Sequence, residues 1–120
     1  MKKFLAIYRG DSKSERRIEW DNLPKEEQQQ KIQQGMQAWG KWMKDNSASI
    51  VVSGGPLGKT LVIDSKGINP TKNKDSGYVI VEATTHEEAA KKFLEHPHFS
   101  IFPGENIELM ECLPIPGSHE

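Results

Sequence analysis

The chain has one cysteine, Cys112, among 120 residues, so an internal disulfide framework is excluded. Its apolar neighbours, Met110 and Leu113, predict a packed thiol and not a nucleophile. No apolar run approaches the roughly 20 residues of a membrane-spanning helix. The apolar stretch at residues 4–8 is interrupted at Arg9, too early for a secretory signal. We therefore expect a cytoplasmic protein that does not partner a membrane.

An excess of charge is also missing. The 16 basic and 17 acidic residues leave a net charge of −1, so no global field attracts nucleic acid, and we expect no direct nucleic-acid partner. The length suits a single domain. We predict one domain over residues 1–113, followed by a flexible tail over residues 114–120, where proline, glycine and serine gather.

Residues 53–60, SGGPLGKT, differ at one position from the G-x-x-x-x-G-K-[ST] motif of nucleotide-binding loops, because Ser53 stands where that motif has glycine. Such a loop opens a helix whose first amides hold phosphate. Here the next residues, TLVID at 60–64, are rich in β-branched side chains and predict a strand. We therefore expect no nucleotide and no other cofactor, and we interpret the glycines as a hairpin connection between residues 50–52 and 60–64.

Two helices are indicated by local signals. Pro24 suits a first helical turn. Apolar side chains recur at helical spacing after it: Ile32, Met36, Trp39 and Met43. The second helix begins with a capping-box pattern, Thr85-x-x-Glu88, and is expected to stop before Pro97.

Strands are predicted at residues 3–8, 50–52, 60–64, 77–83 and 106–113, with polar loops at 11–22 and 65–76. Three of these strands are apolar without alternation, which is typical of strands covered on both faces. Two helices can cover only one face of a small antiparallel sheet. We therefore expect a homodimer in which a second copy covers the other face. The alternative is a monomer whose polar loops fold over that face.

Several segments occur in an order that is known from one family. They are FLAIY at 4–8, the approach to the first helix at 20–27, SGGP at 53–56, GYVIVEA at 77–83, THEEAAKKFLEHP at 85–97 and IELMECLPI at 107–115. In these the chain resembles the YCII-related family, including its subgroup named after a DGPF motif. The resemblance covers nearly the whole chain, and its most specific parts are the G-G-P turn and the G-Y-x-x-x-E-A strand.

The resemblance implies a ferredoxin-like βαββαβ fold of the α+β class with an extra β-hairpin, in which two helices lie on one face of an antiparallel sheet. It implies assembly as a dimeric α/β barrel with a cleft between sheet and loops. It also implies an enzymatic role through a histidine and aspartate pair, and a link to transcription through fusion to sigma-factor domains. Two family features are absent: residues 36–39 lack the histidine of the first helix, and residues 69–75 lack the D-G-P-F stretch. The family pair therefore cannot be assigned to this chain.

Two other residues are predicted to be catalytic. His98 follows the second helix, where loops carry function, and its imidazole titrates near neutral pH. Tyr8 ends the first strand and offers a hydroxyl. His96 and His98 flank a proline, but two ligands without a third make an incomplete metal site, so no metal is expected.

A second set is predicted to bind a small-molecule ligand: Arg9, Trp39, Trp42, Ser53, Gly54, Gly55 and Pro56. Trp39 shares the apolar helix stripe, so a place in the core is its alternative. Trp42 falls beside that stripe, toward a cleft or a dimer seam. Three functions stay open: an enzyme of isomerase, lyase or decomposing type, a non-catalytic binding or regulatory module, and a protein-interaction module in a transcriptional setting.

Overall fold

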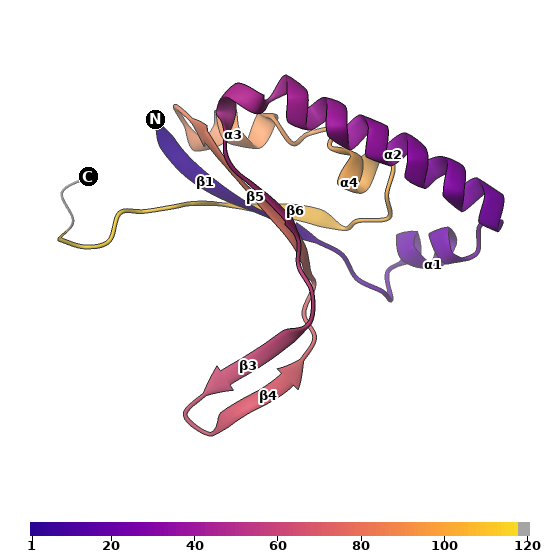
Figure 1. The fold of residues 1–120 in the computed structure, drawn as a ribbon, viewed down its shortest axis with the longest axis horizontal. Helices are drawn as coiled ribbons and strands as arrows, with labels where there is room; N and C mark the ends of the chain where they lie inside the picture. Colours follow the sequence, from indigo (N-terminus) through magenta and orange to yellow (C-terminus); the bar gives the residue numbers. More distant parts are fainter. Residues whose placement is uncertain (118–120) are drawn as a thin grey trace.

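The computed structural model describes residues 1–117, and it shows an antiparallel sheet with helices on one face and a separate hairpin (Figure 1). The sheet has the order β2-β5-β1-β6, with β1 at Lys2–Arg9, β2 at Ile50–Pro56, β5 at Asp75–Ala83 and β6 at Asn106–Glu111. The hairpin pairs β3, Thr60–Asp64, with β4, Gly67–Thr71. The helices are α1 at Glu15–Asp21, α2 at Lys25–Asp45, the 3-10 turn η1 at Ser47–Ser49, α3 at His86–Lys91 and α4 at Pro97–Ser100. This mixed α+β arrangement is consistent with a ferredoxin-like fold.

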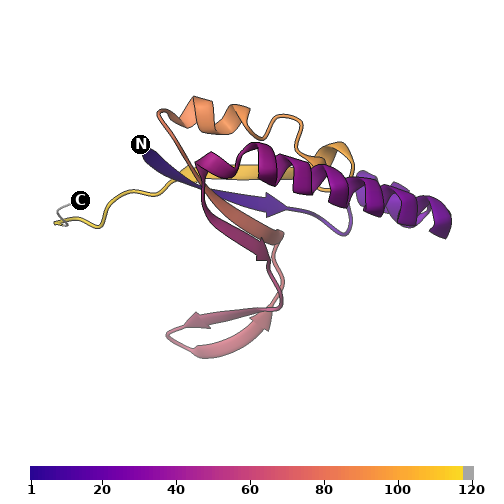
Figure 2. The same ribbon diagram turned by 45° about the horizontal axis from the view of Figure 1, so that its top comes forward.

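The core lies between the sheet and the helices. Alternate residues of β1 and β5 are buried, because successive side chains of a strand point to opposite faces. The buried apolar residues are Phe4, Ala6, Tyr8, Val79, Val81, Ala83, Ala89 and Phe93. The other residues of β1 and β5 face the opposite side of the sheet, which no helix within residues 1–117 covers (Figure 2).

Both predicted helices form, and the second is shorter than predicted. α2 begins directly after Pro24, and Gly35 is its only buried residue. The apolar stripe packs only in its second half, since Met36 remains 66% exposed. α3 starts as the capping box predicts, with the Thr85 hydroxyl oxygen accepting a hydrogen bond from the backbone N–H of Glu88 at 3.1 Å. It ends at Lys91, well before Pro97, and Pro97 opens the short helix α4.

The loop predicted at residues 11–22 contains a helix, α1, so that prediction was wrong. Its beginning is local, because the Ser14 hydroxyl accepts from the backbone N–H of Arg17. Arg16 joins α1 to α4 and to the segment after it by donating to the carbonyls of Phe99 in α4 and of Phe102. A second correction concerns Cys112, which is exposed and not packed, because β6 ends before it.

The hairpin connection expected at the glycines was also wrong. β2 runs through residues 53–56 and pairs with β5, whereas β3 pairs with β4 inside the expected polar loop. Gly54 lets β2 follow β5: its φ is +65°, and a Cβ there would lie 1.9 Å from the carbonyl oxygen of Tyr78. The strand after SGGPLGKT is confirmed, so no helix stands there to hold phosphate.

The expected tail at residues 114–120 falls partly outside the described residues, which end at 117. Within residues 1–117, no helix has the length and apolar character that crossing a membrane requires.

Candidate functional site

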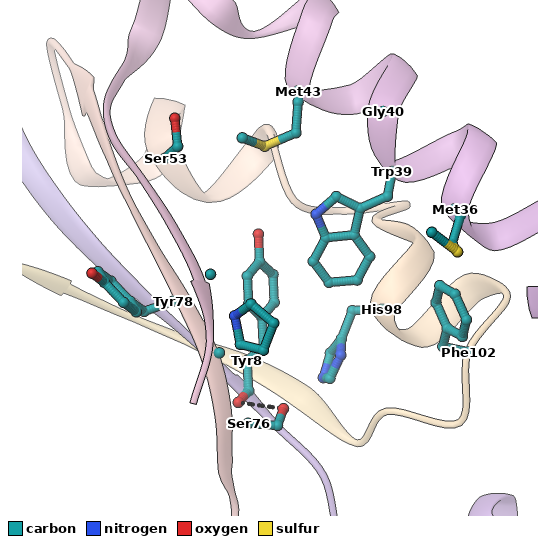
Figure 3. A pocket seen from close by; sticks show the side chains of 13 residues that line it. Tyr8, Met36, Trp39, Gly40, Met43, Ser53, Ser76, Tyr78, His98 and Phe102 are labelled. Carbon is teal, nitrogen blue, oxygen red and sulfur yellow. Dashed lines mark hydrogen bonds between the residues drawn. The ribbon is translucent and has the colours of Figure 1, made fainter. Parts of the chain in front are cut away.

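A cavity of about 540 Å³ lies between α2 and the end of the sheet where β2 and β5 pair (Figure 3). Its lining residues are Tyr8, Met36, Trp39, Gly40, Met43, Ser53, Gly55, Pro56, Ser76, Gly77, Tyr78, His98 and Phe102. Apolar and aromatic groups predominate, and no lysine, arginine, aspartate or glutamate is among them. The volume lies within the range of sites for small molecules.

His96 lies behind this cavity and is fully buried. Its ring packs edge-on against Trp39, with centroids 4.4 Å apart, and against Trp42 at 4.7 Å. The Nδ1 atom accepts a hydrogen bond from the backbone N–H of His98 at 3.0 Å, which caps α4. An N–H group can only donate, so Nδ1 carries no proton, and in the neutral ring the proton sits on Nε2.

The Nε2 of His96 is 3.2 Å from the hydroxyl oxygen of Tyr8. With the proton on Nε2, the imidazole donates and the phenol oxygen accepts. Burial lowers the pKa of His96 to about 3, and neighbouring His98 acts in the same direction. Burial also raises the pKa of Tyr8 above its ordinary value. The pair is therefore a neutral imidazole and a protonated phenol at neutral pH.

His98 ties the ends of two strands together. Its Nε2 lies 2.8 Å from the carbonyl oxygen of Arg9 in β1 and 3.1 Å from that of Asn106 in β6. Carbonyls only accept, so Nε2 carries the proton and Nδ1 of the neutral ring has a free lone pair. Burial lowers the pKa of His98, although both carbonyl bonds act to raise it. The ring fits because residue 104 is glycine: a Cβ there would be 2.4 Å from it.

The predicted site residues fall into two groups. Trp39, Ser53, Gly55 and Pro56 line the cavity together with the two residues predicted to be catalytic. Tyr8 and His98 approach each other closely, with ring centroids 5.3 Å apart.

Three other predicted residues do not line the cavity. Gly54 packs on the backbone of Tyr78. Trp42 belongs to the wall behind His96, where its indole N–H donates to the carbonyl of Lys92 at 2.8 Å.

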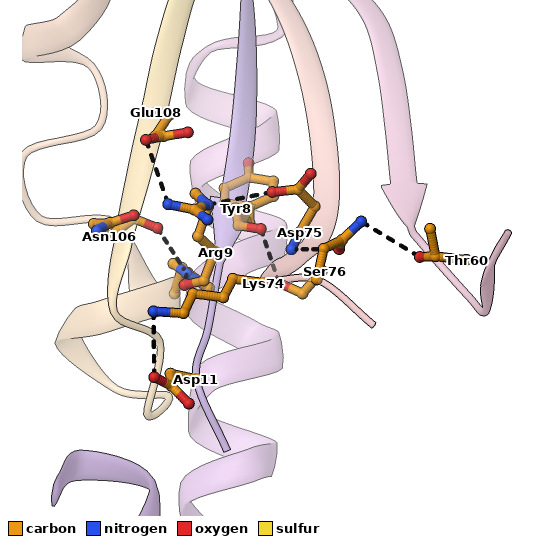
Figure 4. A network of polar contacts seen from close by, with 11 residues as sticks. Tyr8, Arg9, Asp11, Thr60, Lys74, Asp75, Ser76, Asn106 and Glu108 are labelled. Carbon is orange, nitrogen blue, oxygen red and sulfur yellow. Dashed lines mark hydrogen bonds and ion pairs between the residues drawn. The ribbon is translucent and has the colours of Figure 1, made fainter. Parts of the chain in front are cut away.

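Arg9 is not among the residues that line the cavity, and its side chain joins a polar network on the sheet (Figure 4). Its guanidinium pairs with Asp75 at 3.2 Å and with Glu108 at 3.4 Å. Its side chain is therefore engaged with two carboxylates and not with the cavity.

The sequence reasoning missed the role of His96 and part of the lining, including Ser76, Tyr78 and Phe102. A usable signal existed for His96, since a histidine before proline at a helix start can cap that helix. Among residues 1–117, no group of three or more histidine, cysteine, aspartate or glutamate side chains is arranged to hold a metal ion.

No family model matches this chain, and none of the curated proteins does. A solved structure that is similar to it is 5-chloro-2-hydroxyhydroquinone dehydrochlorinase (TftG) from Burkholderia phenoliruptrix AC1100, in complex with 2,5-dihydroxybenzoquinone. The two chains are 21% identical, the match covers 89% of each, and the TM-score is 0.48. At these values the likeness carries no information on what the present chain binds or does.

Proposed function

We propose that this chain is a YCII-related protein that binds a small uncharged molecule in the cavity and transfers a proton within it. His98 is the base and Tyr8 is the hydrogen-bond donor. One observation carries the proposal. The same apolar cavity is lined by Tyr8, whose hydroxyl proton is free to be donated, and by His98, whose Nδ1 lone pair is free to accept a proton.

The free lone pair belongs to Nδ1 of His98. Within residues 1–117, this atom has no hydrogen-bond partner. Every buried side-chain nitrogen or oxygen in that range does have one, so an atom without a partner is not buried. Nδ1 is therefore open to a molecule from outside, and His98 lines the cavity. The lowered pKa keeps this imidazole neutral at neutral pH, which is the state that a base requires.

The free proton belongs to the Tyr8 hydroxyl. The hydroxyl oxygen accepts from His96, so its own hydrogen is available to a ligand oxygen. A carbonyl compound would use both groups. Tyr8 would hold the carbonyl oxygen, and Nδ1 of His98 would take a proton from the adjacent carbon. The imidazolium would then return that proton to a different carbon or to the oxygen, which amounts to an isomerisation without loss of atoms.

The lining defines the class of molecule. Because no charged side chain faces the cavity, an ionised ligand would lose its hydration without gaining a partner. Trp39 and Phe102 present flat aromatic surfaces, with centroids 6.1 Å apart. We infer a small, uncharged and largely apolar ligand with one hydrogen-bonding end.

Proton exchange in D2O tests this directly. Small uncharged aldehydes and ketones with an acidic C–H are incubated with the protein at neutral pH, and NMR follows deuterium uptake. We expect the protein to accelerate uptake for a subset, with loss in His98→Gln and a large decrease in Tyr8→Phe. Tyr78→Phe is the matched control, since Tyr78 pairs with Ile7 and its side chain lies on the face of the sheet opposite Tyr8, so this variant loses a phenol oxygen outside the cavity. Equal rates in all four proteins would contradict the proposal.

The non-catalytic ligand module is the second candidate, favoured by the apolar lining. Ligand-induced shifts of the tryptophan resonances without any deuterium uptake would support it. We also propose the homodimer, in which the uncovered sheet faces of two copies meet. The transcriptional link rests on the family resemblance alone.

A further inference from the structure

The β3–β4 hairpin has one apolar and one polar face. Residues directly opposite each other in an antiparallel pair point to the same side. Leu61 pairs with Pro70 and Ile63 with Ile68, so these four side chains share a face. The intervening pairs carry a mostly polar set on the other face: Thr60, Val62, Asp64, Gly67, Asn69 and Thr71.

The apolar face is uncovered. Leu61 is 59% exposed, Ile63 74% and Ile68 66%. A two-stranded hairpin alone is at best marginally stable in water, and three strands or a packed face are usually needed. The amphipathic pattern therefore indicates a hairpin that is covered when the protein is assembled.

The direction of the hairpin points to what covers it. It projects to the side of the sheet away from α2 and α3 in both orientations of the molecule (Figures 1 and 2). That side carries the open face, defined here as Leu5, Ile7, Val52, Ile80 and Met110. Leu5 pairs with Ile80 and with Met110, and Val52 pairs with Ile80, so these side chains lie on one surface. Ile7, two residues after Leu5 in β1, lies on the same surface, where it pairs with Tyr78 and Glu108. Two uncovered apolar surfaces thus belong to the same side of one chain.

We propose that the hairpin is an arm that packs its apolar face against a second copy of this chain when two copies stack their open faces. The inference rests on the homodimer proposed above. Stacked sheets lie about 10 Å apart, and a strand of five residues spans about 16 Å, so the arm can extend past a sheet stacked on its own. A two-fold axis makes each arm meet the equivalent site on the other copy. One such partner covers both apolar surfaces at once.

Sedimentation equilibrium on matched variants tests the arm. Ile63→Ser combined with Ile68→Ser removes the apolar face, and we expect the dimer dissociation constant to rise by roughly tenfold or more. Val62→Ser lies on the other face of the same hairpin and should change the constant by less than about twofold. Circular dichroism and tryptophan fluorescence show whether each variant keeps the fold of the sheet and helices.

Photo-crosslinking locates the contact. Benzoylphenylalanine at position 63 is irradiated in a mixture of unlabelled and ¹⁵N-labelled protein, and we expect mixed-isotope cross-links to the other copy. If the protein is a dimer but all cross-links are within one chain, or the double variant dimerises as well as Val62→Ser, the arm is refuted and the homodimer stands. If the protein is a monomer at every concentration, arm and homodimer both fail, while deuterium exchange still decides the cavity.

Discussion

The two histidines that flank Pro97 share a tautomer and differ in which of their atoms are free. In both rings the proton is on Nε2, because protein groups fix it there. His96 also has Nδ1 engaged, as the cap of α4, so both of its nitrogens are used in the structure. Within residues 1–117, His98 has only Nε2 engaged. His96 therefore orients Tyr8, and His98 is left with an atom for a ligand.

Replacing Tyr8 with phenylalanine tests this division at the level of one oxygen atom. The ring packing remains, but the buried Nε2–H of His96 loses its acceptor. An unsatisfied buried donor costs about 1–3 kcal/mol, so we expect the free energy of unfolding to fall by about that amount. Urea denaturation at pH 7 measures it. Tyr78→Phe should change the value by less than about 0.5 kcal/mol; an equal loss in both variants would contradict the donor role of His96.

His96 also predicts how stability depends on pH. Its ordinary pKa of 6.5 falls to about 3 in the fold, so between these values the unfolded chain binds a proton that the folded chain does not. The contribution is complete above about pH 6.5 and is lost as the pH falls toward 3, with a slope of about 1.4 kcal/mol per pH unit. Burial lowers the pKa of His98 as well, in the same direction.

Urea denaturation between pH 7 and pH 4 measures this slope. The variant His96→Asn keeps an acceptor for the α4 cap and has no titrating group. We expect its slope to be smaller than that of the original protein by about 1.4 kcal/mol per pH unit. Identical slopes would show that His96 is not held neutral by the fold.

At the scale of elements, helix α2 carries two glycines with opposite expected behaviour. A Cβ on Gly35 would be 2.5 Å from the ring of Phe102, whereas a Cβ on Gly40 would meet nothing within 4 Å. We expect Gly40→Ala to stabilise the protein by about 0.5–1 kcal/mol through helix propensity. Gly35→Ala gains the same propensity but displaces Phe102, so its net effect should be destabilising by about 1–3 kcal/mol. Thermal unfolding of both variants decides this, and two stabilised variants would refute the contact.

Features whose determining residues are close together in the sequence could be predicted, and features that depend on distant residues could not. The start of α3 follows from Thr85 and Glu88, three residues apart, and it was predicted correctly. The pairing of β2 with β5 joins Val52 to Ile80 and depends on Gly54 lying against Tyr78, so the nearer strand was wrongly chosen. β4 lies in a segment that the sequence predicts as a polar loop, because a five-residue strand containing Asn69 and Pro70 carries too few apolar residues to show a period.

The site followed the same rule. Tyr8 and His98 are predicted because each is expected near the end of an element, where functional groups gather, and the structure places both in the cavity lining, although His98 lies within α4. The capping role of His96 has a local signal, but its hydrogen bond to Tyr8 could not be derived, because Tyr8 is 88 positions away in the chain. Arg9 was misplaced because Asp75 and Glu108, which hold it, lie on two other strands.

For the whole molecule, the sheet has two sides of different character. The helix side contains the core and the cavity, and the other side carries the open face together with the arm. Substitutions at Ile80 or Met110 on the open face, which do not line the cavity, should therefore affect the proposed assembly and leave the cavity intact. This separation allows the homodimer to be tested without disturbing Tyr8 or His98.

The last prediction concerns Ile80, which pairs with Leu5 at the middle of the open face and is only half-buried in a single copy. Ile80→Arg places a charge where the second sheet would pack. The free energy needed to bury that charge without a partner exceeds the free energy that apolar contacts at this position contribute to the interface. We expect a protein that sediments at 13.6 kDa, against twice that mass for the original chain. Leu94→Arg is the control, since Leu94 is 69% exposed and follows α3, on the helix side. If both variants sediment as the original chain does, the open face is not the interface.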